Sequence, residues 1–333
     1  MPRTLPLALA ALALAAALPS ADAAQAAPGT APAPRSPVHA VHDLPDHRAY
    51  PEGIARDPRT GDLYVGSFAT GAVYRITPGQ RGATTFLPAG ADGRATANGL
   101  KVDRAGRLWV TDSSAGVAVY DLHRRTLLAR FDVAGDTPSF VNDLTIAPDG
   151  SAYLTDSRRA VVYRVTRDEL DRASAGSGHG TLTARYDLSG ALTPHAPDAY
   201  TLNGIVADPS GRYLLTVDST AGDLFRLDLA AGGIRRVTLH GGSMLLADGL
   251  DLRHGILRAA HNTRNAVSRW RLSPDKTTAR MTREVTDPSL QVPTTLVRQG
   301  GRTLVVRSQF DKGGPMGPGT PETPFTIAAV DGI

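Results

Sequence analysis

The sequence predicts an all-β fold, a six-bladed β-propeller. The prediction rests on a recurring motif, the nearly constant spacing of its copies, and the same internal order within each copy. The motif is a tripeptide that precedes an apolar segment of strand character; it contains Gly, Asn or Asp in five copies and reads Pro293-Thr294-Thr295 in the sixth. The central residues of the six copies are Glu52, Asn98, Asn142, Asn203, Asp248 and Thr294. Successive copies are 46, 44, 61, 45 and 46 residues apart, and a repeat of about 40 to 50 residues is typical of a propeller blade.

Each copy shows the same alternation of strands and turns. In the second copy, residues 99–103, 107–111 and 117–120 have strand character, and turns containing Gly106 and Gly116 separate them. A small antiparallel sheet of this kind cannot bury both of its faces alone. Stacking such sheets around an axis buries the faces and removes most free edges. The segments 38–43 and 325–330 lie outside the six copies, and we expect one or both to complete the last blade.

The long third step indicates an insertion in two parts. A helical turn is expected at 166–172, followed by a flexible linker over 172–180. The second part, 192–200, leads directly into the motif of Asn203 and is expected to lie over the mouth of the propeller as a partial lid. Tyr200 and, more weakly, His195 are therefore candidate substrate contacts.

The N-terminal residues predict export. Residues 5–18 are apolar and are followed by a small-x-small cleavage pattern at 20–23. About 14 apolar residues are short of the roughly 20 that span a bilayer. We therefore expect a signal peptide over 1–23, a disordered Ala/Pro-rich leader over 24–37, and a single propeller domain over 38–333. The mature protein is expected to be secreted, without a membrane anchor, and monomeric.

The composition excludes several classes of function. The chain contains no cysteine, which excludes a disulfide framework, a thiolate zinc site and a catalytic thiol. The formal net charge is +4, and the basic residues are scattered. A basic stripe with aromatic platforms is missing, so we expect no nucleic-acid partner. A small-molecule substrate is the expected partner.

The six motif centres form a set of oxygen donors. In a propeller the innermost strands begin around the central channel, so these side chains should converge near the axis. Two carboxylates and several amide oxygens suit a hard cation, and calcium fits a cage of divergent oxygen ligands better than magnesium does. The alternative is that the Asn-Gly and Asp-Gly pairs are simply turn formers.

Four of the motifs carry a family resemblance. Residues 51–55, 141–144, 202–205 and 247–250 resemble the signature of the regucalcin (senescence marker protein)/gluconolactonase family and its calcium-dependent phosphotriesterase-like relatives. The resemblance covers residues 50 to about 308. It implies a six-bladed propeller with one divalent cation in the channel and hydrolysis of sugar lactones or phosphotriester-type bonds. The ligands that it implies are Glu52, Asn142, Asn203 and Asp248.

Departures from the family pattern point to the substrate. Asn98 stands where the family often has no ligand. We expect it to contact substrate, and the alternatives are that it joins the metal or caps a turn. Phe140 replaces the Arg that reads substrate in sugar-lactone hydrolases. Together with Leu202 and Leu246 it predicts a less polar mouth, suited to a more apolar lactone or ester.

Two residues are candidates for proton transfer or nucleophilic attack. Asp248 is expected to act as general base or nucleophile near the cation, with Glu52 as the alternative. His261 lies 13 residues after Asp248, on the expected ligand side, and offers a second base; alternatively it is a turn residue facing water. Asp112, Asp156 and Asp218 occupy the same repeat phase as His261 and are expected to bind turn amides.

Two functions follow from these features. The first is an exported calcium-dependent hydrolase of a lactone, ester or phosphotriester. The alternative is a non-catalytic propeller that binds a ligand or a protein and holds a structural cation.

Overall fold

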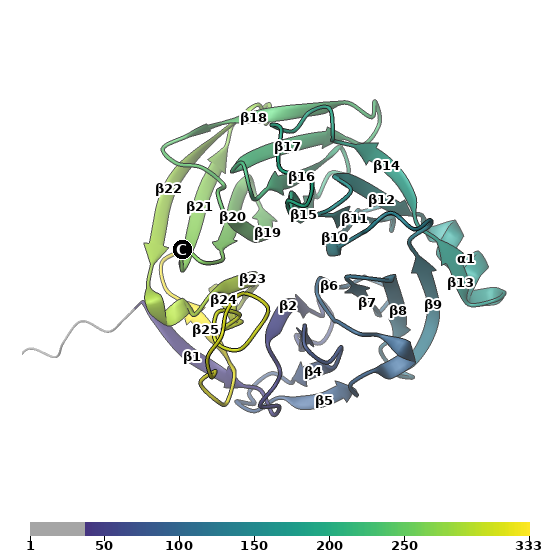
Figure 1. Ribbon diagram of the computed structural model, residues 1–333, viewed down its shortest axis with the longest axis vertical. Helices are drawn as coiled ribbons and strands as arrows, with labels where there is room; N and C mark the ends of the chain where they lie inside the picture. Colours follow the sequence, from purple (N-terminus) through teal and green to yellow (C-terminus); the bar gives the residue numbers. More distant parts are fainter. Residues whose placement is uncertain (1–36) are drawn as a thin grey trace, which may run out of the picture. The chain divides into compact units, whose positions relative to one another are not determined.

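The strands are arranged around a central axis, as Figure 1 shows for the described part of the chain. The computed structural model describes residues 37–333, and this part is an all-β, propeller-like fold. The predicted signal peptide, 1–23, and the predicted leader, except for residue 37, lie outside the described residues. Among the helices of the described part, none combines the length and the apolar character needed to span a membrane.

Three sheets are built from the first half of the domain. The first contains β2 (Pro51–Arg56), β3 (Leu63–Ser67), β4 (Val73–Ile76) and β5 (Thr84–Leu87). The second contains β6 (Leu100–Val102), β7 (Arg107–Asp112), β8 (Gly116–Asp121), β9 (Thr126–Asp132) and the inserted β13 (His179–Thr181). The third contains β10 (Val141–Ile146), β11 (Ala152–Asp156), β12 (Val161–Val165) and β14 (Thr183–Asp187).

The second half forms two further sheets, one of them with eight strands. The eight strands are β15 (Leu202–Ala207), β16 (Tyr213–Asp218), β17 (Asp223–Asp228), β18 (Ile234–His240), β19 (Ala247–Arg253), β20 (Ile256–His261), β21 (Ala266–Leu272) and β22 (Thr278–Thr286). The last sheet contains β23 (Pro293–Gln299), β24 (Arg302–Arg307), β25 (Thr326–Val330) and β1 (Val38–Asp43). Short 3-10 turns lie at Ala91–Gly93 and Pro288–Leu290.

The eight-stranded sheet is where the structure differs from six separate sheets. It consists of two antiparallel meanders, β15 to β18 and β19 to β22, whose outer strands pair in parallel over three residues, Thr238–His240 with Thr278–Arg280. The long outer strand β22 reaches the edge of β18, and the two edges satisfy each other's backbone groups. The described chain thus has five hydrogen-bonded sheets, and the prediction is confirmed at the level of an all-β propeller-like fold.

The ends of the domain close the last sheet, as predicted. The N-terminal strand β1 pairs antiparallel with β25, from Val38 opposite Val330 to Asp43 opposite Thr326. β25 in turn pairs with β24. Because strands from both ends of the domain share one sheet, neither end leaves an unpaired strand beside the ring.

The insertion is more ordered than predicted. Helix α1 spans Arg167–Ala175, so it continues through residues assigned to a flexible linker. Thr166 caps its N-terminus: its hydroxyl accepts from the Glu169 amide, and the Glu169 side chain accepts from the Thr166 amide. The linker prediction for 172–180 is therefore wrong over most of its length. His179–Thr181 forms β13, which pairs in parallel with the outer edge of β9.

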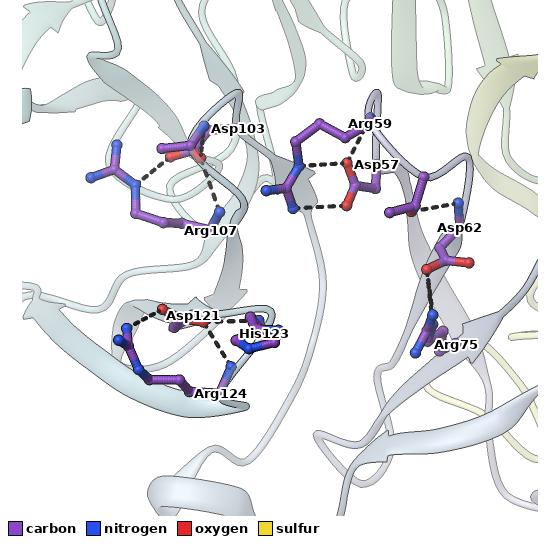
Figure 2. Close-up of polar contacts among 11 residues, drawn as sticks. Asp57, Arg59, Asp62, Arg75, Asp103, Arg107, Asp121, His123 and Arg124 are labelled. Carbon is purple, nitrogen blue, oxygen red and sulfur yellow. Dashed lines mark hydrogen bonds and ion pairs between the residues drawn. The ribbon is translucent and has the colours of Figure 1, made fainter.

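Aspartates stabilise the turns between the first two strands of a sheet, such as β2–β3 and β6–β7. In Figure 2, Asp57 accepts from the Arg59 backbone and guanidinium at 2.8 to 3.2 Å. Asp103 accepts in the same way from the Arg107 amide at 3.0 Å and its Nε at 2.6 Å. These bonds replace backbone partners that the tight turns lack, and so they fix the register of each hairpin.

The apolar core lies between neighbouring groups of strands. Tyr64 and Val73 from the first sheet share one buried cluster with Leu100 and Val110 from the second. Trp270 is fully buried in a cluster that joins the two meanders of the eight-stranded sheet. Because the apolar residues pack between sheets, the polar residues at the start of the innermost strands can face the central channel.

Candidate metal-binding and catalytic site

A β-bulge places each candidate ligand at the start of an innermost strand. Glu52, Asn142, Asn203 and Asp248 are the second residues of β2, β10, β15 and β19. In each of these strands the register shifts between the first residue and the fourth, so that one extra residue stands on the inner strand. A bulge bends the strand and re-aims a side chain. Here it releases the ligand residue from the regular alternation of the sheet.

The glycine after a ligand serves close packing between innermost strands. A Cβ at Gly53 would lie 1.9 Å from the Asn98 carbonyl oxygen, and one at Gly204 would lie 2.1 Å from that of Asp248. Asn203-Gly204 and Asp248-Gly249 lie inside strands. The alternative that these pairs are turn formers is therefore wrong.

The four residues meet at one cavity. It has a volume of about 420 Å³, and Glu52, Asn142, Asn203 and Asp248 all line it. We call these four residues the floor of the cavity. Residues separated by up to 196 positions in the sequence are thus brought to one site, as the repeat spacing predicts.

The amide oxygens of the floor have no protein partner. Within residues 37–333, Asn142 Oδ1 and Asn203 Oδ1 are buried and accept no hydrogen bond. The Asn142 amide nitrogen donates to Ser157 Oγ at 3.0 Å, which directs the oxygen away from that serine. Buried polar atoms are rarely left unpaired, because desolvation without a partner costs about 1 to 3 kcal/mol. Two such oxygens on one cavity fit an oxygen-liganded cation.

The two carboxylates of the floor carry perturbed pKa values. Burial, with the neighbouring Asp248 and Asp143 carboxylates, raises the pKa of Glu52 well above its usual range. Burial raises the pKa of Asp248 to about 7, although hydrogen bonds from Asn262 and Asn203 oppose the shift. A cation beside them would favour the ionised forms of both groups. In residues 37–333 there is no cluster of three His, Cys, Asp or Glu side chains that could hold a metal ion. The floor does not form such a cluster because two of its four candidate ligands are asparagine amides.

The predicted substrate contacts Phe140 and Tyr200 both line the cavity. Their rings meet edge to face, with centroids 5.0 Å apart and an interplanar angle of 89°. Arg158 Nη2 donates to Tyr200 Oη at 3.1 Å. Leu246, expected at the mouth, also lines the cavity, whereas Leu202 is fully buried in the apolar core.

Asn98 and His261 do not line the cavity. Asn98 is fully buried, and within the described chain neither polar atom of its side chain has a hydrogen-bond partner. His261 is also fully buried, with Nδ1 at 3.0 Å from the Leu245 carbonyl oxygen and Nε2 at 2.6 Å from Ser268 Oγ. A water-facing turn position for His261 is wrong. Catalysis by His261 and substrate contact by Asn98 stay predictions, and these positions give neither residue direct access to the cavity.

The aspartates at the phase of His261 bind backbone amides, as predicted. Asp156 Oδ1 accepts from the amides of Phe140, Arg158 and Arg159 at 3.0 Å each. The bond to Phe140 fixes the segment that leads into Asn142. Asp218 also contacts the predicted lid, because its Oδ2 lies 2.6 Å from His195 Nε2.

The sequence reasoning missed the residues that orient the ligands. Asn262 Nδ2 donates to Asp248 Oδ2 at 3.0 Å, and Ser157 plays the same part for Asn142. Ser157 and Asn262 each follow the residue at the Asp156 and His261 phase of the repeat, and that shared position was the available signal. Other lining residues that the sequence did not indicate include Phe68 directly after β3, Phe310 after β24, and Pro315 and Met316 in the loop before β25.

Comparison with known proteins relates the chain to a described family. The sequence matches the family described as SMP-30/Gluconolactonase/LRE-like region over residues 50–308. No curated protein matches the sequence.

Solved structures show the same fold at low identity. A candidate gluconolactonase, solved as a structural-genomics target, has a TM-score of 0.59 at 16% identity, covering 88% of this chain and 90% of its own. The major allergen Mala s 1 of Malassezia sympodialis has a TM-score of 0.60 at 14% identity, covering 87% and 95%. Virginiamycin B lyase of Staphylococcus aureus has 0.56 at 11% identity, covering 88% and 98%.

Proposed function

The chain belongs to the SMP-30/gluconolactonase/LRE-like family, and we propose that it is an exported, calcium-dependent hydrolase of a lactone, ester or phosphotriester-type bond. One observation carries the proposal. Two buried carboxylates and two buried amide oxygens without a partner line a single cavity in a fold of this family. The proposal includes secretion, which rests on the N-terminal sequence, and a monomer acting on a small molecule.

We also propose that the domain counts as six blades. Each antiparallel group of four strands is one blade, and the eight-stranded sheet is two blades joined at their outer edges by the pairing of β18 with β22. This count gives one innermost strand for each of the six motif copies.

The residues of the floor have separate roles in this proposal. Glu52, Asn142, Asn203 and Asp248 would hold the cation, which when bound supplies Lewis-acid polarisation of the carbonyl or phosphoryl oxygen and acidifies water. Asp248 would take a proton from the attacking water or attack directly, because it lines the cavity and the cation would keep its carboxylate ionised. Asn262 holds one oxygen of Asp248 in place.

Cation binding is the first test of this function. Chelator-treated protein would be melted with calcium, magnesium or zinc added back, together with Asp248→Asn and, as control, the exposed Asp331→Asn. A ligand at 100 times its dissociation constant stabilises the native state by about 2.7 kcal/mol. We expect a calcium shift in the wild type and in Asp331→Asn that is absent from Asp248→Asn.

Hydrolysis is the second test. Calcium-loaded protein would be assayed against neutral lactones, aryl esters and a phosphotriester, with Asp248→Asn as the inactive reference. Calcium binding without turnover of any of these bonds would instead favour the non-catalytic binding propeller. No shift with any cation would remove the metal-dependent mechanism.

A further inference from the structure

Exposed apolar side chains gather at the mouth of the cavity. In residues 37–333 the large apolar side chains that remain exposed are Tyr200, Leu245 and Met316, at 46%, 41% and 49%. They come from three segments that are far apart in the sequence. Tyr200 and Met316 line the cavity, and Leu245 precedes the lining residue Leu246. Exposed apolar residues that cluster around one opening indicate recognition of an apolar ligand.

The walls below this rim are also largely apolar. Phe68 and Phe310 form one aromatic pair, with centroids 5.3 Å apart, and Phe140 and Tyr200 form another at 5.0 Å. The rest of the lining, outside the floor, adds Leu246, Ala247, Pro315, Met316, Asn262 and the hydroxyl residues Ser219, Thr220 and Thr263.

The charge of the lining disfavours an anionic substrate. Among the described residues, no Arg, Lys or His lines the cavity, and the carboxylate side chains that do are Glu52 and Asp248 on the floor. A substrate carboxylate or phosphomonoester would find no cationic side chain in the lining. A sugar lactone would lose water from several hydroxyls against aromatic walls that offer few partners.

The aromatic wall is held in place by neighbouring residues. Phe140 is anchored through its backbone amide, which donates to Asp156 Oδ1 at 3.0 Å. Tyr200 is fixed at both ends, by its edge-to-face contact with Phe140 and by the bond from Arg158 to its hydroxyl. The Arg158 guanidinium also lies 4.9 Å from the Tyr200 ring centroid. A wall fixed before binding loses little conformational entropy when a ligand packs on it.

We propose that the substrate is a neutral lactone or ester that carries an apolar substituent of several carbons, rather than a polyhydroxylated sugar lactone. This inference rests on the proposed hydrolase function. The reacting carbonyl lies toward the floor, and the substituent runs along the aromatic walls to the rim at Tyr200 and Met316. Hydrolysis consumes one water. Its oxygen joins the carbonyl carbon, the acyl carbon–oxygen bond breaks, the leaving oxygen takes one proton, and the other is released as the carboxylate forms.

Chain length in a lactone series tests this inference. kcat/KM of the calcium-loaded protein would be measured for γ-butyrolactone, γ-hexalactone, γ-octalactone and γ-decalactone, with glucono-δ-lactone as the polar comparison. Each methylene buried against the walls should raise kcat/KM about three- to fourfold. Leu246→Ala and Met316→Ala should flatten this dependence, whereas Leu127→Ala, a control on the outer strand β9, should keep it.

Lactam analogues separate this inference from the proposed function, because they have the same shape and resist hydrolysis. Their affinity for the calcium-loaded protein would be measured by calorimetry over the same chain lengths. Lactone turnover that rises with chain length, with lactam affinity rising in parallel, supports the inference. Turnover without such a rise, or a preference for glucono-δ-lactone, overturns the inference and leaves the hydrolase function. Rising lactam affinity without any turnover overturns the hydrolase function but supports recognition of apolar ligands, and flat lactam affinity without turnover overturns both.

Discussion

Positions at the same phase of the repeat are used in two different ways. Asn142 and Thr294 are each the second residue of an innermost strand, and each lies in a β-bulge. The Asn142 oxygen is buried on the cavity without a partner. The Thr294 hydroxyl instead donates to the Glu52 carbonyl oxygen at 2.7 Å and lies 2.8 Å from Ser308 Oγ.

The difference follows from the reach of the side chain. A threonine hydroxyl on Cβ stays close to the backbone and bonds the neighbouring innermost strand. The amide oxygen of asparagine stands one atom further out, and its nitrogen can be held from behind, as Ser157 holds that of Asn142. The repeat thus determines where a residue lies, and side-chain length and a supporting partner determine whether it is available to a ligand. This separates ligand positions, such as Asn142, from non-ligand positions, such as Thr294, at the same phase of the repeat. Both kinds of position need close packing between innermost strands, which the first prediction tests.

The largest effect is expected where innermost strands touch. Gly204→Ala would place a Cβ 2.1 Å from the Asp248 carbonyl oxygen, where backbone must move. We expect a loss of about 3 to 5 kcal/mol in the free energy of unfolding, or failure to fold. The control is Gly233→Ala, where a Cβ meets no atom within 4 Å. Urea denaturation of both variants checks this; equal midpoints would mean that the strands can separate without cost.

The next largest effect is a pH dependence of the free energy of unfolding that comes from the ligand position Asp248. In the cation-free protein the pKa of Asp248 is raised by burial to about 7 from 3.8. The native state therefore binds more protons than the unfolded state between these values, and the free energy of unfolding falls as pH rises through 7. One unit of pKa corresponds to about 1.4 kcal/mol, so the loss is at most about 4 kcal/mol.

Melting of chelator-treated protein between pH 4 and pH 8 measures this loss. Asp248→Asn should melt with a weaker pH dependence, and calcium should remove most of the dependence in the wild type by favouring the carboxylate. Apparent calcium affinity should fall as pH drops below 7, because protonation of Asp248 competes with the cation. A stability of the chelated wild type that increases from pH 5 to pH 8 would contradict the assignment.

Direct replacement of ligands separates the two classes of position. Glu52→Gln removes one of the two floor carboxylates and keeps its shape, so calcium affinity should fall on the order of a hundredfold. Thr294→Val should leave calcium affinity unchanged, because the threonine hydroxyl bonds protein groups. Titration calorimetry with calcium measures the affinity of both variants. A comparable loss of calcium affinity in the two would mean that position in the repeat alone determines which residues bind the cation.

The fold was largely predictable because its repeat is visible in the residues. Six motif copies at similar spacing predict a ring of similar units, and the segments at both ends of the domain that lie outside the copies were expected to complete the last sheet. The joining of two meanders into an eight-stranded sheet was not predictable. It depends on the last three residues of β18, Thr238–His240, which run past the pairing with β17 to reach β22, and no short motif encodes that extension.

The site was predictable where repeat phase decides the geometry and unpredictable where tertiary packing does. Glu52, Asn142, Asn203 and Asp248 share a phase, and the structure brings them to one cavity. His261 shares a phase with Asp156, but the imidazole is enclosed between the Leu245 carbonyl and Ser268 inside the sheet, and the sequence carries no sign of that enclosure. Phe68 and Phe310 are 242 positions apart in the sequence, and their side chains meet because the first and last sheets lie next to each other in the fold.

A smaller effect is expected for the residues that hold the ligands from behind. Asn262→Ala removes the donor to Asp248 Oδ2 while leaving every floor residue in place. Loss of such an orienting partner costs about 10- to 100-fold in metal affinity. Asn262→Asp also removes the donor, but its added negative charge attracts the cation, so it should weaken binding less at pH 8, where the new carboxylate is ionised, than at pH 5. Calorimetry at both pH values gives the answer, and an unchanged affinity in Asn262→Ala would assign this residue to packing alone.

The smallest effect tests the non-ligand class by itself. Thr294→Val keeps the shape of the side chain but leaves the Glu52 carbonyl oxygen and the Ser308 hydroxyl without this bonding partner. Removing one partner of a buried hydrogen bond costs about 1 to 3 kcal/mol, and we expect the lower half of that range because Ser308 also donates to the Pro51 carbonyl. Thr238→Val, at an exposed position of β18, is the matched control and should lose less than about 0.5 kcal/mol. Urea denaturation of the wild type and both variants, with and without saturating calcium, measures the effect, and the loss in Thr294→Val should be the same in both conditions. If Thr294→Val lost stability only in the presence of calcium, its hydroxyl would belong with the ligands, and the division between the two classes of position would fail.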